Sequence, residues 1–466
     1  MSSALFASFL LMSLAEPATP AQRRIAAAEA AVARDARAVA PRVELAMALA
    51  RRARETSDPG FYARALDTLA EAEKLSPGDY QVGRTRAWTL LGQHRFAEAR
   101  DEAKALNRRA PDDVLVYGLM GDAHLELGEY AEAEEALQWM MNLRPGNVPA
   151  LTRGAYFREL IGDVDGALEF MNSAFDRTAL DEVEDRAWIA TQVAHLLLTT
   201  GRVAEAEAAA QRALELFPGY HYALAQLAGV RTAQGRHDEA VTLLRRRYQQ
   251  APHPENLYDV AKALARAGRI AEARQAFAEF EGKAKAEMAG ADNCNRELSA
   301  YYVDEAKRPA EGLRVAEQEL ARRRDVFTLA AHAWALSAVG RSAEARKQME
   351  AALAVGIKDA RLLYEAGVIA SRAGDRAEAK RYLDQSLRVN AASEVAALAR
   401  QARSRLGAQC VIATYENAFY VRSRPSLRAP QLPCKGRRPR SWPRSASRAG
   451  TRPPSATARS RGSPAG

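Results

Sequence analysis

Residues 128–137 read GEYAEAEEAL, and closely similar ten-residue stretches recur along the chain. Each stretch joins a turn to the start of an amphipathic helix. Clear copies are GRVAEAEAAA at 201–210, GRHDEAVTLL at 235–244, GRIAEARQAF at 268–277 and GDRAEAKRYL at 374–383. A unit that recurs at a fixed interval predicts one stacked array and argues against a set of independent globular domains.

The small residue inside each stretch gives the repeat length. Ten such residues lie 33, 34 or 39 positions apart: Ala65, Ala99, Ala133, Ala167, Ala206, Ala240, Ala273, Gly312, Ala345 and Ala379. A second small residue precedes nine of them by twelve positions, as at Gly121 and Gly367, and allows two helices to cross closely. Proline follows five of them by twelve positions, where it ends one helix and starts the next unit. The spacing predicts about ten pairs of antiparallel helices.

This pattern resembles the tetratricopeptide repeat family, whose unit is about 34 residues long. Tyr117, Gly121, Ala133 and Pro145 match the family pattern most fully, and most other units carry Leu in place of the early aromatic residue. The resemblance covers roughly residues 40–390. It implies an all-α fold, a right-handed superhelical solenoid of about ten helix-turn-helix repeats, whose first helices form a concave groove for peptides or partner helices.

Composition divides the chain into five segments. We expect a signal peptide at 1–15, an N-terminal helix at 16–40, the solenoid at 41–390, a capping helix at 391–409 and a basic Pro/Arg/Ser-rich disordered tail at 410–466. The apolar run at 4–15 is too short to span a bilayer, so no transmembrane segment is expected after cleavage. It predicts a periplasmic or secreted protein. Because no Lys or Arg precedes the run, a helix that packs on the first repeat of a cytoplasmic protein is the alternative.

The net charge of +9 comes from the tail. Residues 421–466 hold 12 basic and no acidic residues, so the remaining 55 basic and 58 acidic residues leave the folded part at −3. Nucleic acid is therefore not the expected partner of the solenoid. Nucleic-acid or polyanion binding through the Arg-rich tail is the alternative function.

No motif for catalysis or metal binding occurs in the sequence. It has no Gly-x-Ser-x-Gly elbow, phosphate loop or His-Glu-x-x-His helix, and its cysteines, Cys294, Cys410 and Cys434, lack zinc spacing. Three histidines, His94, His237 and His253, fall in turns or after a proline, where we expect them to face solvent. The sequence predicts a non-enzymatic protein-binding scaffold without cofactor or metal.

Aromatic residues concentrate at the groove positions of the first helices. Aromatic side chains supply large contact areas at low entropic cost, so these residues are predicted to bind a protein partner. The predicted groove residues are Trp88, Tyr156, Trp188, His195, Tyr222, Tyr258, Tyr301, Trp334 and Tyr364, and Phe327 shares their position. Packing against the next unit is the alternative for each, notably for Trp188 and Phe327. Lys262 and Arg361 could meet acidic groups of the partner.

Two insertions interrupt the regular spacing. They produce the 39-residue steps and lie at 181–185 and around 282–295. Insertions on one edge of a solenoid are sometimes functional. The expectation for both is a tolerated surface loop.

Overall fold

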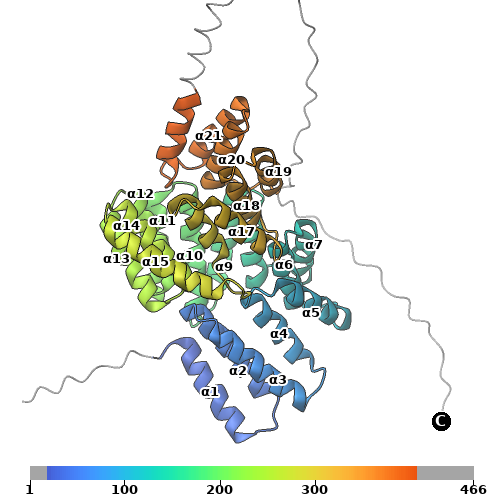
Figure 1. Ribbon diagram of the computed structural model, residues 1–466. Coiled ribbons are helices and arrows are strands. Elements are labelled where there is room, and N and C mark those ends of the chain that lie inside the picture. Colours follow the sequence, from blue (N-terminus) through green and yellow to red (C-terminus); the bar gives the residue numbers. More distant parts are fainter. Residues whose placement is uncertain (1–17, 407–466) are drawn as a thin grey trace, which may run out of the picture. The chain divides into compact units, whose positions relative to one another are not determined.

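The computed structural model of the protein describes residues 18–406, which form helices joined by short connections (Figure 1). An N-terminal helix, α1 (Pro20–Arg34), precedes ten helix pairs. The first helices are α2 (Ala40–Thr56), α4 (Tyr80–Gly92), α6 (Val114–Leu127), α8 (Val148–Leu160), α10 (Val183–Thr199), α12 (His221–Ala233), α14 (Pro254–Arg266), α16 (Asn295–Ala300, continued by a π-helical turn to Glu305), α18 (Val326–Ala338) and α20 (Ala360–Arg372).

The second helices are α3 (Gly60–Leu75), α5 (Phe96–Arg109), α7 (Tyr130–Leu143), α9 (Val164–Arg177), α11 (Val203–Leu216), α13 (His237–Gln250), α15 (Ile270–Glu287), α17 (Pro309–Leu320), α19 (Ser342–Leu353) and α21 (Arg376–Val389). Each pairs with the first helix that precedes it, and consecutive pairs stack. The all-α solenoid of ten repeats predicted from the spacing is confirmed.

The predicted small residues lie where the paired helices cross. Most of the ten anchor residues have no exposed surface: Ala65, Ala99, Ala133, Ala167, Ala206, Ala345 and Ala379. At Gly121 a Cβ atom would lie 2.8 Å from Cδ2 of Leu137, and at Gly367 it would lie 2.7 Å from Cγ of Leu383. Both distances are shorter than van der Waals contact, so glycine is needed there to let the helices approach.

Polar side chains cap several of the first helices. Five Asp or Asn caps accept a hydrogen bond from a backbone N–H in the first turn: Asp79, Asp113, Asn147, Asp325 and Asp359. Such caps satisfy donors that have no partner within the helix, and each typically contributes about 1 kcal/mol. They fix the residue at which each of these helices begins.

The later repeats of the solenoid contact its earlier ones. Lys358 Nζ donates to the carbonyl oxygen of Gly162 at 2.8 Å. The backbone N–H of Val326, in α18, donates to the hydroxyl oxygen of Tyr130, in α7, also at 2.8 Å. Successive turns of the superhelix are therefore packed against one another within the described residues.

Both insertions contribute to these contacts between turns. The first places three carboxylates beside arginines of α1 and α2: Glu182 with Arg24 and Arg51, Glu184 with Arg54, and Asp185 with Arg51 and Arg54. The second lengthens α15 and adds the connection 288–294, from which an Asp292 oxygen lies 3.5 Å from His94 Nδ1 of the second repeat. The expectation of tolerated surface loops was wrong, because both insertions join repeats that are distant in sequence.

Additional helices lie at both ends of the array. At the first repeat, the backbone N–H of Ala21 in α1 donates to the carboxylate of Glu55, which is 8% exposed, at 3.0 Å. After the tenth repeat, residues 396–406 are helical, and Arg403 pairs with Asp384 of α21. The predicted signal peptide at 1–15 lies outside the described residues, as does the tail at 410–466.

Candidate protein-binding site

A pocket of about 390 Å³ lies on the first helices of the last four repeats. Helices α14, α16, α18 and α20 all contribute side chains to it. Its aromatic lining consists of Tyr258, Phe327 and Trp334, and its charged lining of Glu255, Asp259, Lys262, Arg296, Glu297, Arg361 and Glu365. Four consecutive repeats thus contribute to one concave surface on the side of the solenoid where the groove was predicted.

Neighbouring groups hold the aromatic rings in place. The centroid of the Tyr258 ring lies 4.9 Å from that of Phe280 and 4.7 Å from the ammonium group of Lys262. Trp334 is half-buried and donates through Nε1 to Asp304 Oδ1 at 2.8 Å. Rings that are fixed before a ligand arrives lose little conformational entropy on binding. The aromatic part of the pocket is therefore preorganised.

Arg361 has more carboxylate neighbours than one cation can neutralise. Its guanidinium lies 2.8 Å from Glu394, 3.0 Å from Glu365 and 3.6 Å from Asp304. At Glu365, burial raises the pKa of the carboxyl more than the charge of Arg361 lowers it, so that this pKa is about 7. Burial also acts to raise the pKa of Glu394, but nearby cations, Lys262 first, outweigh it and hold that pKa at about 2. Glu365 therefore keeps its proton to a higher pH than an exposed glutamate does, despite its contact with Arg361.

Carboxylates also outnumber free cations where α14 and α16 line the pocket. Burial, and then the charge of Glu297, raises the pKa of Glu255. Arg247 lies 4.0 Å from Glu255 because its guanidinium is engaged by Asp259 at 2.6 Å. Within residues 18–406, Glu297 makes no ion pair, and the adjacent Arg296 lies 3.8 Å from the carboxylate that caps α18. This region favours a positively charged group on a ligand.

Two of the nine predicted groove residues, Tyr258 and Trp334, line this pocket. Tyr364 lies beside it, with its ring centroid 6.5 Å from that of Trp334. Tyr301 is 9% exposed and packs against the phenylalanines of α15, so it belongs to the core. Trp88 packs against a separate core cluster of α4, α5 and α6.

The other four predicted groove residues lie on α8, α10 and α12. His195 Nε2 lies 2.7 Å from a carboxylate oxygen of Glu159; burial acts to lower the pKa of His195, but Glu159 outweighs it and raises that pKa. An arginine of α2 lies over the Trp188 ring. Tyr222 packs against the core cluster formed by helices α8 to α12, and Tyr156 packs against the core cluster around α18. A role of these residues in partner binding stays a prediction.

The sequence analysis missed five of the seven charged side chains of the pocket, all but Lys262 and Arg361. Lys262 and Arg361 were named as cations that could meet acidic groups of a partner, and the structure pairs both with carboxylates of the same chain. Glu255, Asp259 and Lys262 stand three or four residues apart, on the same face of α14 as Tyr258. That spacing is the signal that could have identified them.

One group of described side chains has donor atoms of the kinds that bind transition metals. The ligand atoms of His253, Glu287 and Cys294 lie within 4.8 Å of one another, and none of the three residues lines the pocket. His253 is half-buried, so the expectation that it faces solvent was wrong. Its position between Pro252 and Pro254 directs it toward the second insertion.

Family models agree with the repeats seen in the structure. Three models described as tetratricopeptide repeats match residues 84–138, 197–255 and 360–393. The chain is a tetratricopeptide repeat protein. The matched segments lie in repeats two and three, five and six, and ten. These matches confirm the family that was predicted from the sequence. No curated protein matches the chain.

Several solved structures resemble this tetratricopeptide repeat protein. Human IFIT1, in a dimer with PPP-AAAA, is 13% identical, with 76% of this chain and 90% of that chain covered and a TM-score of 0.44. A thermophilic TPR protein from Thermus thermophilus is 24% identical, with 41% and 98% covered and a TM-score of 0.37. Yeast Tom70 is 12% identical, with 79% and 96% covered and a TM-score of 0.35. At identities this low, none of them indicates what this protein binds.

Between residues 18 and 406, no helix has both the length and the apolar character needed to cross a bilayer.

Proposed function

We propose that this protein is a non-enzymatic scaffold that binds a short segment of a partner protein in the pocket of repeats seven to ten. Repeat scaffolds of this family serve protein interaction. The observation that carries the proposal is the convergence of three aromatic side chains and unneutralised carboxylates from four consecutive first helices, around about 390 Å³.

The lining indicates the chemistry of the segment. Tyr258, Phe327 and Trp334 favour an apolar or aromatic side chain, since such contacts dominate binding hot spots. Glu255 and Glu297 favour a Lys or Arg near it, because a cation would relieve the repulsion between two carboxylates. A segment that presents an apolar side chain next to a basic one fits both requirements.

The proposed location of this interaction is the cell envelope or the extracellular space. The support is the signal-like run at 4–15 in the sequence. Cell fractionation of the producing organism tests it, with residence in the cytoplasm as the contrary result.

The test of binding compares two tryptophans in the full chain. Tagged wild-type protein, Trp334→Ala and Trp139→Ala are incubated with envelope extract, and the retained protein is identified and its affinity measured by calorimetry. Trp139 is the matched control because it is 43% exposed on the second helix α7, away from the pocket. We expect Trp334→Ala to lose about 2 kcal/mol, or roughly 30-fold in affinity, and Trp139→Ala to bind as wild type does.

Two outcomes would contradict the proposal. Equal affinity of wild type and Trp334→Ala, with helicity unchanged in both, would remove the pocket as the binding site. Retention of polyanions alone, lost when residues 421–466 are deleted, would favour the Arg-rich tail as the functional part.

A further inference from the structure

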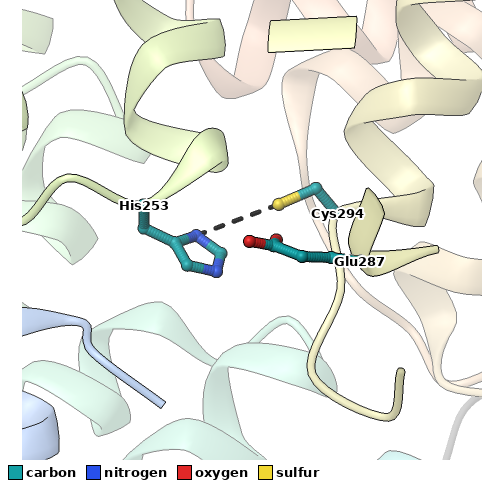
Figure 2. A group of neighbouring side chains, drawn as sticks. All are labelled: His253, Glu287 and Cys294. Atoms are coloured by element: carbon teal, nitrogen blue, oxygen red, sulfur yellow. Dashed lines mark hydrogen bonds between the residues drawn. The ribbon is translucent and has the colours of Figure 1, made fainter. Parts of the chain in front are cut away.

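His253, Glu287 and Cys294 come from three separate elements and point toward a common centre (Figure 2). His253 caps α14, Glu287 is the last residue of α15, and Cys294 precedes α16. His253 Nδ1 lies 3.8 Å from Cys294 Sγ. Cys294 is 1% exposed, so the centre lies below the protein surface.

The carboxyl of Glu287 points to a missing partner. Its Oε2 is buried and makes no hydrogen bond, which is costly for a polar oxygen. The ligand atoms of Glu287, His253 and Cys294 all lie within 4.8 Å of one another. A cation bound between these three residues would satisfy the oxygen.

We propose that His253, Glu287 and Cys294 form a binding site for a transition-metal ion, with zinc as the metal that fits best. A tetrahedral zinc ion holds sulfur and nitrogen ligands about 3.5 Å apart, close to the observed separation of Nδ1 and Sγ. Imidazole and thiolate are ligands that zinc prefers and that magnesium and calcium avoid. Water takes the fourth position.

Charge balance supports a divalent ion at this buried place. The thiol of Cys294 gives up its proton to solvent as the Sγ–metal bond forms, and Glu287 binds as the carboxylate. The two negative charges neutralise a divalent ion, while His253 binds as neutral imidazole. A buried site with no net charge avoids most of the cost of transferring ions out of water.

The backbone around His253 suits this role. Pro252 and Pro254 flank it and restrict the chain on both sides, and its φ and ψ are −83° and 144°. Apart from its long contact with Cys294 Sγ, its Nδ1 accepts a long hydrogen bond, 3.4 Å, from the N–H of Glu255. The Nδ1 lone pair thus has no strong partner to lose when a metal binds.

The site would connect the second insertion to the sixth and seventh repeats. Glu287 directly precedes the connection 288–294, Cys294 is its last residue, and His253 stands at the junction of α13 with α14. The same connection carries Asp292, a carboxylate oxygen of which lies 3.5 Å from Nδ1 of His94 in the second repeat. The metal would therefore stabilise a contact between successive turns of the solenoid.

Cobalt titration of the full chain tests the site. Cys410 and Cys434 are changed to serine so that Cys294 is the one thiol left, and the protein is reduced and freed of metal before Co²⁺ is added. We expect one equivalent of Co²⁺ with a thiolate-to-cobalt absorption band, and displacement of the band by Zn²⁺. Cys294→Ser should abolish the band, and Glu287→Gln should weaken binding by more than about tenfold, the loss that removal of even an outer-shell partner causes.

The controls separate this site from incidental binding and from misfolding. His237→Ala removes a histidine of α13 outside the cluster and should bind Co²⁺ as the parent does. Circular dichroism verifies the fold of each variant, and Glu287→Gln decides if Cys294→Ser does not fold. Absence of the band in the parent, or unchanged binding in Glu287→Gln, would overturn the proposal.

Discussion

The pKa of Glu365 predicts how stability depends on pH. Glu365 is 7% exposed, and burial raises its pKa from 4.5 to about 7 in the native state. The difference of about 2.5 between these values corresponds to about 3 kcal/mol, because one pKa unit is worth about 1.4 kcal/mol. Since the native pKa is the higher one, the neutral carboxyl contributes full stability below pH 4.5, and that contribution is lost as the pH rises through 7.

Glu365→Gln measures this loss directly, because glutamine is neutral at every pH and keeps an oxygen for Arg361. We expect the free energy of unfolding of Glu365→Gln, minus that of wild type, to increase by about 2.5 kcal/mol between pH 5 and pH 8. Other titrating groups are common to both proteins and cancel in the difference. Urea unfolding followed by tryptophan fluorescence provides the values.

The control is Glu135→Gln, on the exposed face of α7, for which the difference from wild type should not change with pH. Repeat arrays can unfold in stages, so the transition of the last repeats is compared between proteins, not a single global midpoint. A difference for Glu365→Gln that stays constant from pH 5 to pH 8 would refute the assignment of a raised pKa to this carboxyl.

Three further substitutions test the packing of the solenoid. Gly121→Ala places a Cβ 2.8 Å from a leucine of α7 and should destabilise the protein by about 1–3 kcal/mol, whereas Gly282→Ala in α15 meets nothing within 4 Å and should stabilise it by about 1 kcal/mol. Urea unfolding checks both, and the same sign for the two would contradict the close approach at Gly121. Glu184→Ala should cost about 2–3 kcal/mol, since it leaves the hydroxyl of Tyr220, 2.6 Å away, without its acceptor and leaves Arg54, 2.9 Å away, with only the more distant carboxylate of Asp185. The same assay measures it, and a loss below about 0.5 kcal/mol, the range of ordinary surface changes, would show that this contact between turns adds little.

The sequence predicted the repeats because each one packs mainly against its neighbours. Gly121, where α6 crosses α7, lies twelve positions before Ala133 of α7. Sequence spacing alone therefore reveals this crossing. The same holds at Gly367 and Ala379 in the tenth repeat. Local packing of this kind is independent of how the whole array coils.

Contacts between turns could not be predicted in the same way. Arg24 and Glu182 are 158 residues apart, and Tyr130 and Val326 are 196 apart. Whether such residues meet depends on the small rotation between successive repeats, added over four or more of them. An insertion such as the one that carries Glu182 gives no indication of the arginine opposite it.

One of the two candidate sites could be predicted from the sequence and the other could not. Tyr258 and Trp334 were predicted from their place on the first helices, and they do share a pocket. His253 and Cys294 were not connected, because they are 41 residues apart and meet only where the longer α15 and the connection after it return toward the start of α14. A search for metal motifs with short spacing cannot find such a pair.

The contacts between turns bear on how the pocket would bind the proposed partner segment. An array held by neighbour contacts alone can change its curvature at low cost, so its inner surface must be ordered by the ligand. Here partly buried ion pairs such as that between Arg54 and Glu184 join distant repeats, and Lys358 joins the connection before α20 to the fourth repeat. Because α20 contributes Arg361 and Glu365 to the pocket, the geometry of those side chains is set partly by repeats that never touch the ligand. A preformed pocket of this kind gains affinity from rigidity more than from area, which suits recognition of a short segment.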